Sequence, residues 1–334
     1  MKISDAQKII GLWGEELVRL EKRRDAYLVI TRTGKCCLKA VHEKKEKVLF
    51  MIEVMNYLKA NGFERMAMCL PALDKSMVRE YQGTHYIVQE WLDGIDPDYR
   101  NVEQMVKAAE TLALCHRSGI GFTPGKGSKV KNNLGKWPRK LEENYQDLLR
   151  YIDMANSNIS PTVFEKRLIS ISPWLEERAR KSIWKLKNSC YLQFVREATE
   201  RGCLVHGDPA TRNFIIEDGQ VILIDFDSAA IEINVVDLWK LFRRFLRRNR
   251  WQLDKMESLL SAYNKYYVLD KNQLKVLEAL IEFPERAWRI TREYYDKQNS
   301  DWWNEGSLTK KIEELCGQWR EKDAFINDFE NSLT

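Results

Sequence analysis

The sequence predicts an α+β fold in two lobes, a small β-rich lobe at the N-terminus followed by a large, mainly helical lobe. Short runs in which polar and apolar residues alternate, as they do in strands, lie before residue 92. Apolar residues at helical spacing fill most of the chain after residue 100. The chain of 334 residues is also longer than one hydrophobic core usually supports. We therefore expect one lobe over residues 1–92 and the other over residues 93–334.

In the first lobe, the segment "DAYLVITRTGKCCLKAV" (25–41) predicts two strands joined by a turn at Thr33-Gly34. A helix is expected over residues 43–63, because its apolar residues fall on one face and Asn61-Gly62 supplies a C-terminal stop. The segment "MVREYQGTHYIVQEW" (77–91) predicts a further hairpin around Gly83. Together these elements predict a small sheet with one main helix.

The segment "EWLDGIDPDY" (90–99) combines Gly, Pro and acidic residues after a strand, which favours a hinge between the lobes. A helix capped by Asn101 and ending at Gly119 follows. Residues 121–137 are rich in Gly, Lys and Asn and predict an exposed loop. Further helical patterns cover residues 138–157, 173–200 and 234–332.

The composition is that of a globular protein, with 44% hydrophobic and 31% charged residues. The N-terminus carries no apolar targeting segment and the chain contains no run of about 18 apolar residues, so we expect cytoplasmic synthesis and no membrane partner. Seven cysteines without C-x-x-C spacing and four scattered histidines indicate neither a zinc site nor a disulfide framework. A net charge of +5 permits an anionic ligand but does not favour nucleic acid.

The stretch "LVHGDPATRNFIIEDGQVILIDFDSA" (204–229) carries the clearest chemical signal. Asp218-Gly219 between two β-branched runs predicts a hairpin with a type I′ turn. Pairing outward from that turn sets Asn213 opposite Ile224, so Asn213 and Asp225 emerge at the same open end. Asp208 returns toward that end through the preceding loop.

Three oxygen-bearing side chains at one hairpin mouth suit a hard cation, most naturally Mg²⁺ shared with phosphates. The same arrangement matches phosphoryl transfer, in which one Asp receives a hydroxyl proton while an Asn and a second Asp hold the metal. Asp and Asn are also common turn formers, but a plain turn does not require all three at this spacing.

"VHGDPATRN" and "LIDFDSA" resemble the H-G-D-x-x-x-x-N loop and the metal-binding strand of aminoglycoside phosphotransferases and choline-kinase-like enzymes, which have a protein-kinase-like fold. "TLALCHRSG" and "THYIVQEWLDG" resemble the helix before that loop and the hinge, so the likeness covers about residues 20–300. Within this superfamily, "NNLGKWPRKLEE" and "HGDPATRNF" resemble the CotS-like spore coat proteins of endospore formers.

The resemblance implies that Asp208 is the catalytic base, that Asn213 and Asp225 bind Mg²⁺, and that Lys39 reaches the α- and β-phosphates of ATP. His206 would support the loop, and Asp227 would support a metal ligand or cap a helix. The acceptor would be a small-molecule hydroxyl compound, and a spore coat location with other coat proteins as partners would follow from the narrower likeness.

Two departures from the family pattern favour an alternative, a catalytically weak or inactive kinase-fold component of the spore coat. The glutamate expected to pair with Lys39 is missing, because its usual position holds Met51 while Glu46 and Glu53 lie elsewhere on the helix. The segment "RLEKRRDAY" (19–27), where a nucleotide loop is expected, contains no glycine, so Arg23 and Arg24 would have to contact phosphates instead.

Two segments of the second lobe have a structural and a functional interpretation. The arginines of "VVDLWKLFRRFLRRNRW" (235–251) form either a solvated basic face or a docking site for an acidic partner or a phosphorylated acceptor. The aromatic residues of "FPERAWRITREYYDKQNSDWW" (283–303) fill the core or, alternatively, form a cage for a cation.

Overall fold

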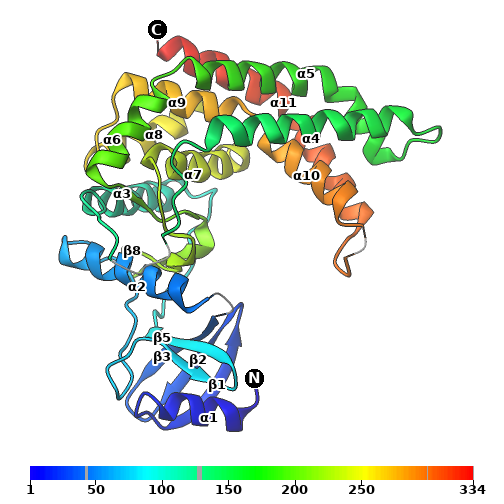
Figure 1. The fold of residues 1–334 in the computed structure, drawn as a ribbon. Coiled ribbons are helices and arrows are strands. Elements are labelled where there is room, and N and C mark those ends of the chain that lie inside the picture. Colours follow the sequence, from blue (N-terminus) through cyan, green and yellow to red (C-terminus); the bar gives the residue numbers. More distant parts are fainter. Residues whose placement is uncertain (42–43, 126–129, 299, 334) are drawn as a thin grey trace. The chain divides into compact units, whose positions relative to one another are not determined.

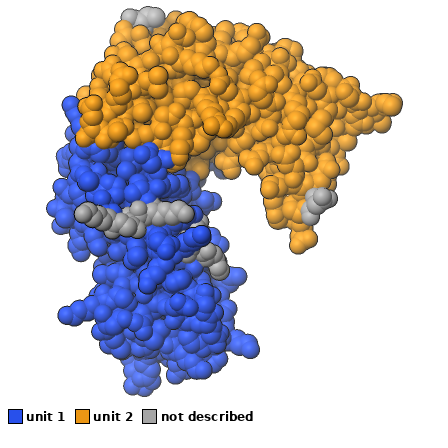
Figure 2. Space-filling model, in the orientation of Figure 1, with its two compact units in different colours: residues 1–132, 201–231, 265–267 blue, residues 133–200, 232–264, 268–334 orange. Residues whose placement is uncertain are grey.

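The computed structural model describes residues 1–41, 44–125, 130–298 and 300–333. It consists of two compact units, shown in different colours in Figure 2. Unit 1 comprises residues 1–132, 201–231 and 265–267, and unit 2 comprises residues 133–200, 232–264 and 268–334. The predicted α+β class is confirmed, because a sheet in the N-terminal part is followed by a mainly helical remainder (Figure 1).

Unit 1 contains a five-stranded antiparallel sheet in the order β1-β2-β3-β5-β4 (Figure 1). Helix α1 (Ile3–Gly11) packs on it through Ile9 and Ile10, which join Val29 and Leu38 in one apolar cluster. The strands are β1 (Leu17–Arg23), β2 (Ala26–Thr31), β3 (Lys35–Val41), β4 (Arg79–Tyr81) and β5 (Thr84–Glu90).

The two predicted hairpins of this sheet and the turn at Thr33-Gly34 are confirmed. Helix α1 and strand β1 were not predicted. Every residue of β1 is half-buried or exposed, as suits an edge strand, so its charged sequence lacks the alternation that reveals a strand.

Helix α2 (Lys45–Ala60) lies within the predicted range and ends at Asn61, followed by Gly62 with a φ of +84°. Residue 43 of the predicted helix lies outside the described residues. Helix α3 (Val102–Ser118) begins as predicted, because the Asn101 side chain accepts a hydrogen bond from the backbone N–H of Gln104. Between β5 and α3 the chain forms no regular element, but Ile95 pairs with Ile216 in an isolated bridge.

The quoted stretch 204–229 and the two residues after it form two short sheets of unit 1. Strand β6 (Leu204–Val205) pairs with β9 (Ala230–Ile231), and β7 (Phe214–Glu217) pairs with β8 (Gln220–Leu223). Two single-turn 3₁₀ helices, η1 (Thr211–Asn213) and η2 (Phe226–Ser228), lie at the ends of the second hairpin. All four candidate site residues therefore belong to unit 1.

Unit 2 is helical throughout its described regular elements. The helices are α4 (Trp137–Ser157), α5 (Val163–Lys187), α6 (Tyr191–Arg201, whose last residue is assigned to unit 1), α7 (Asn234–Arg248), α8 (Leu253–Asn264), α9 (Lys271–Glu282), α10 (Glu285–Asp296) and α11 (Glu305–Ser332). Described residues of the predicted loop 121–137 precede α4, and residues 126–129 of that loop lie outside the described part.

One helix was predicted over residues 173–200, but the structure has two. Helix α5 begins ten residues earlier than predicted and ends at Lys187, and α6 begins at Tyr191. Thr162 and Glu165 form a capping box that starts the helix. Pro173 lies inside it, and the Ser172 hydroxyl donates to the Ile169 carbonyl, the group that the missing proline N–H would have bonded.

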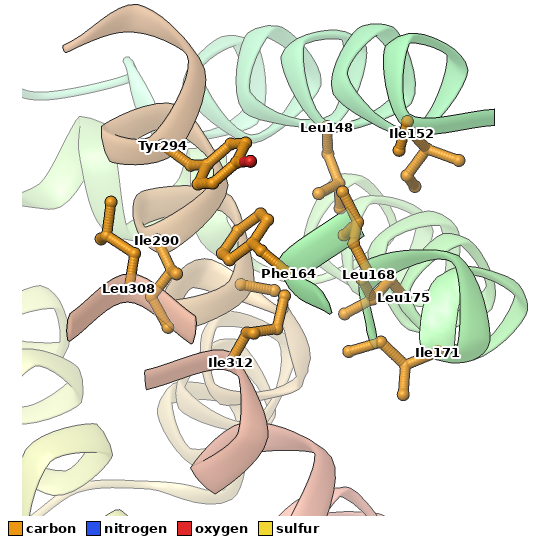
Figure 3. Close-up of a cluster of buried hydrophobic side chains, with 12 residues drawn as sticks. Leu148, Ile152, Phe164, Leu168, Ile171, Leu175, Ile290, Tyr294, Leu308 and Ile312 are labelled. Atoms are coloured by element: carbon orange, nitrogen blue, oxygen red, sulfur yellow. The ribbon is translucent and has the colours of Figure 1, made fainter. Parts of the chain in front are cut away.

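The core of unit 2 gathers side chains from α4, α5, α10 and α11, which point toward one another in Figure 3. Tyr294 stacks on Phe164 with ring centroids 3.9 Å apart, and Tyr295 stacks on Tyr151 at 5.3 Å. Tyr294 therefore lies in the core and Tyr295 packs against it, as the first of the two interpretations expects, whereas Trp302 of the same segment is exposed. In the described part of the chain, no helix has the length and apolar character needed to span a membrane.

Candidate active site

The β7–β8 hairpin has the register that its turn predicts. Asp218 and Gly219 both have positive φ, at 48° and 74°, as a type I′ turn requires. One step beyond the last pair, the Ile224 N–H donates to the Asn213 carbonyl at 2.9 Å. The predicted pairs are confirmed: Phe214 with Leu223, Ile215 with Ile222, Ile216 with Val221, and Glu217 with Gln220.

His206 ties the loop before the hairpin to the same strand end. Its Nε2 lies 2.9 Å from the Ile224 carbonyl, and its Nδ1 accepts from the Asp208 backbone N–H at 3.3 Å. Nδ1 acts as the acceptor, so the proton belongs on Nε2 and the ring is neutral. The imidazole is fully buried and packs edge-on against Phe226. These contacts are those of a residue that supports the loop.

Asp208 and Asn213 lie next to each other on this loop. The Asn213 Nδ2 donates to the Asp208 carbonyl at 2.8 Å and approaches the Asp208 carboxylate at 3.4 Å. Arg212 donates to the same carboxylate at 2.9 Å. Because Asn213 donates through its amide nitrogen, its amide oxygen remains available to bind a cation.

Gly207 explains why the loop needs a glycine between His206 and Asp208. Its φ is +87°, and a Cβ added there would lie 2.0 Å from the Ser228 carbonyl oxygen. Only a residue without a side chain allows the loop to approach the segment that follows Asp225 so closely.

Asp225 follows β8 in a left-handed conformation, with φ and ψ both 66°. Its carboxylate accepts from the Lys39 Nζ at 2.6 Å, and the Asp227 carboxylate accepts from the same ammonium at 2.8 Å. Lys39 lies on β3 and is mostly buried. The fold thus brings the strand lysine to the open end of the hairpin.

The charges of this group influence one another. Burial acts to lower the pKa of Lys39, but the Asp227 and Asp225 carboxylates outweigh it and raise that pKa above its ordinary value. Burial raises the pKa of Asp227; the Lys39 ammonium opposes the rise and the Asp225 carboxylate adds to it. Lys39 therefore carries a full positive charge between two carboxylates.

Lys39 was expected to pair with a glutamate on the following helix, but it pairs with Asp225 and Asp227 instead. Met51 is buried in α2, and the Glu53 carboxylate accepts from the Gly125 N–H instead. Lys39 is therefore not unpaired but relies on these two aspartates.

The segment expected as a nucleotide loop is mostly strand. Strand β1 runs to Arg23 and β2 starts at Ala26, so the turn consists of Arg24 and Asp25. Arg24 has a positive φ of 49°, forms an ion pair with Asp96 and donates to the Arg212 carbonyl at 3.1 Å. Arg23 pairs with Glu21 on its own strand. Arg24 thereby joins the turn to the loop that carries Asp208.

The donor set at the hairpin mouth fits a magnesium ion. Asp225 and Asp227 offer carboxylate oxygens and Asn213 an amide oxygen, which are the ligand types that Mg²⁺ prefers. The two carboxylates already hold a cation in the form of the Lys39 ammonium. Among the described residues, no group of three or more His, Cys, Asp or Glu side chains is arranged to hold a metal by itself.

The family model described as phosphotransferase enzyme family matches residues 16–280, and the chain belongs to this family. The sequence is 24% identical to spore coat protein S of Bacillus subtilis (strain 168), over 91% of this chain and 86% of that protein. Both likenesses inferred from the sequence motifs are thereby confirmed.

Solved structures show the same fold at low sequence identity. An aminoglycoside phosphotransferase from Alicyclobacillus acidocaldarius superposes with a TM-score of 0.87 at 18% identity, covering 95% of this chain and 92% of that chain. A spectinomycin phosphotransferase in complex with ADP and spectinomycin superposes with a TM-score of 0.67 at 12% identity, covering 97% and 98%.

Proposed function

We propose that the chain is an ATP- and Mg²⁺-dependent phosphotransferase that acts on a small-molecule hydroxyl, in a protein of the spore coat. The observation that carries this proposal is the ion pair between Lys39 and Asp225, next to the loop of Asp208 and Asn213. Lys39 and the residues of the loop and hairpin thus lie close together, although they come from distant parts of the chain.

Each residue has a role in this proposal. Asp208 would accept the proton of the acceptor hydroxyl as its oxygen bonds to the γ-phosphorus of ATP, the bond to the β–γ bridging oxygen breaks, and ADP leaves. Lys39, from the lobe proposed over residues 1–92, would contact the α- and β-phosphates. Asn213 and Asp225 would hold Mg²⁺, which when bound neutralises charge on the phosphate oxygens.

Relatives support the substrate classes. The spectinomycin phosphotransferase of the same fold was determined with ADP and with spectinomycin, a nucleotide and a small molecule. Likeness to spore coat protein S along most of both chains supports the spore coat as location, with other coat proteins as partners.

A second candidate function is a kinase-fold structural component of the coat with little or no activity. The two-residue turn of Arg24 and Asp25 favours it, because so short a turn provides few backbone N–H groups for phosphates. The two candidates differ in whether the chain binds nucleotide through a metal.

Thermal unfolding separates them. Mg-ATP should raise the melting temperature, whereas ATP with a chelator should not, since a ligand of the folded state stabilises it by mass action. Asp225→Ala should remove the Mg-ATP effect. Asp208→Asn should keep the binding effect and lose phosphate transfer to the acceptor. An unchanged melting temperature at millimolar Mg-ATP would refute the enzyme, and retained turnover in Asp208→Asn would refute Asp208 as the base.

A further inference from the structure

Arg212 lies inside the loop that carries the candidate base. Its guanidinium donates to the Asp208 Oδ2 atom at 2.9 Å, and the Asn213 Nδ2 atom approaches the same oxygen at 3.4 Å. The H-G-D-x-x-x-x-N pattern leaves position 212 unspecified, so the likeness to the family assigns no role to this arginine. The loop therefore holds a cation, next to the candidate base, that the motif does not account for.

The backbone of Arg212 is held in place, whereas its side chain can move. Its carbonyl accepts from the Arg24 guanidinium at 3.1 Å, and the residue lies in the single-turn helix η1. The side chain is 64% exposed, and Asp208 is its one hydrogen-bond or ion-pair partner among the described residues. The guanidinium can therefore leave Asp208 without disturbing the loop.

The ion pair between Arg212 and Asp208 contributes little to stability. A largely exposed arginine gains little Coulomb energy in water, and holding its side chain in one geometry costs entropy. The loop is held instead by the buried His206 ring and by the Asn213 amide, which donates to the Asp208 carbonyl at 2.8 Å. A positive charge that the fold does not need, beside a candidate catalytic carboxylate, indicates a role in the reaction.

The geometry of phosphoryl transfer brings the phosphorus within reach of this guanidinium. The hydroxyl oxygen that Asp208 deprotonates must lie about 3 Å from the carboxylate, and the phosphorus that this oxygen attacks lies at most about 3.5 Å further on. Rotation about the side-chain bonds of an arginine moves its guanidinium over such distances. The planar fork of the guanidinium also matches two oxygens of a phosphoryl group.

We propose that Arg212 is a further catalytic residue, whose guanidinium leaves Asp208 and binds the γ-phosphoryl group; this inference rests on the proposed function. As the acceptor oxygen bonds to the γ-phosphorus, its proton passes to Asp208, and the electron pair of the broken bond to the bridging oxygen leaves with ADP. Protonation removes the charge of Asp208 and weakens its pair with Arg212. The guanidinium then neutralises negative charge on the transferred oxygens.

Calorimetric titration with Mg-ATP and with Mg-ADP tests this role, because only ATP carries the γ-phosphate and no acceptor is needed. The parent should bind Mg-ATP more tightly than Mg-ADP. Arg212→Gln should weaken the binding of Mg-ATP about tenfold, through loss of a charge-assisted contact, and change that of Mg-ADP by less than about twofold. Without nucleotide, Arg212→Gln should melt within about 1 °C of the parent, because the exposed ion pair contributes little.

Arg32→Gln is the matched control, because Arg32 is an exposed arginine of the same unit whose guanidinium lies 2.9 Å from a single carboxylate, that of Glu16. It should leave both affinities unchanged. Asp208→Asn releases the guanidinium and should tighten the binding of Mg-ATP. The same substitution should give no such gain in the Arg212→Gln background, which makes the two residues a double-mutant cycle.

Failure of this inference can be told from failure of the proposed function. No binding of Mg-ATP to the parent would refute the phosphotransferase and the role of Arg212 with it. If the parent binds both nucleotides with equal affinity, or if Arg212→Gln changes both affinities equally or not at all, only the role of Arg212 is refuted. A gain from Asp208→Asn that persists in the Arg212→Gln background would arise from the lost carboxylate charge alone and would also overturn that role.

Discussion

The Lys39 ammonium lies 2.6 Å from the Asp225 carboxylate, across a sequence separation of 186 residues. This one ion pair connects β3 of the N-terminal sheet to the open end of the β7–β8 hairpin. Asp227 shares the same ammonium at 2.8 Å. Two carboxylates therefore depend on one lysine for their counter-charge.

Replacement of that lysine should destabilise the protein. Lys39→Met leaves Asp225 and Asp227 side by side without a cation, and we expect a loss of about 1–2 kcal/mol in the free energy of unfolding, since both carboxylates are partly exposed to solvent. Urea denaturation measures this loss. Lys35→Met is the control from the same strand. It breaks a solvent-exposed pair with Asp93 and should cost less than about 0.5 kcal/mol, so equal losses would contradict the prediction.

The loop of Asp208 should not tolerate a side chain at Gly207. Gly207→Ala combines a positive φ with a contact of 2.0 Å to the Ser228 carbonyl, and we expect a loss of about 3 kcal/mol or more. Gly219→Ala shares the positive φ but meets no atom within 4 Å, and it should cost about 1 kcal/mol. Chemical denaturation of the two variants compares them directly. A Gly207 variant as stable as the Gly219 variant would show that the loop does not need this close approach.

His206 should act through its hydrogen bonds. His206→Phe retains an aromatic ring against Phe226 but leaves the Ile224 carbonyl and the Asp208 N–H without this partner. We expect a loss of about 2 kcal/mol in the free energy of unfolding. His85→Phe, at a partly exposed position on β5, should change stability by less than about 0.5 kcal/mol. Similar values for the two variants would exclude a supporting role for His206.

Glu232 should make unit 2 less stable as the pH rises. Burial raises the pKa of this carboxyl from 4.5 to about 7, although the Trp137 and Ile233 N–H groups and the charges of Lys240 and Lys140 oppose the shift. At a pH between these two pKa values, Glu232 is protonated in the folded state but has lost its proton in the unfolded state. The free energy of unfolding therefore falls as the pH rises from about 4.5 through about 7, by on the order of 3 kcal/mol in total.

Unfolding free energies at several pH values test this sign. Glu232→Gln should remove the fall in that window, because its neutral amide can still accept from the Trp137 N–H. Glu200→Gln, at an exposed position in the same unit, should keep the fall. A wild-type stability that rises over this range, or a fall that persists in Glu232→Gln, would contradict the assignment.

Local rules were sufficient for the hairpin. The Asp218-Gly219 turn determines the pairing from Phe214 to Leu223, and with it the shared position of Asn213 and Asp225. The same applies to the Asn101 cap and to the stop at Asn61-Gly62. In each case the signal lies within a few residues of the structure that it specifies.

Contacts between residues far apart in the chain are not indicated by any local sequence pattern. The partners of Lys39 lie 186 and 188 residues away, whereas the following helix carries only Met51 at the expected position and two glutamates elsewhere. Strand β1 was missed because an edge strand needs no apolar alternation, and the start of α5 because the Ser172 hydroxyl compensates for Pro173 locally. Only the partners of Lys39 were hidden by a long-range contact; the start of α5 depends on a hydrogen bond within the helix.

The turn between β1 and β2 has a consequence for the kinetics of ligand capture. It is two residues long and is attached through the Arg24 side chain to Asp96 and to the Arg212 carbonyl. A phosphate-binding loop holds a polyphosphate through its backbone N–H groups, which act only at short range. An exposed guanidinium such as that of Arg24 attracts the polyphosphate over a longer range, set by the Debye length of about 8 Å in physiological salt. If the chain binds nucleotide as proposed, the association rate should fall as salt is added, and the Arg24 charge should contribute to that fall.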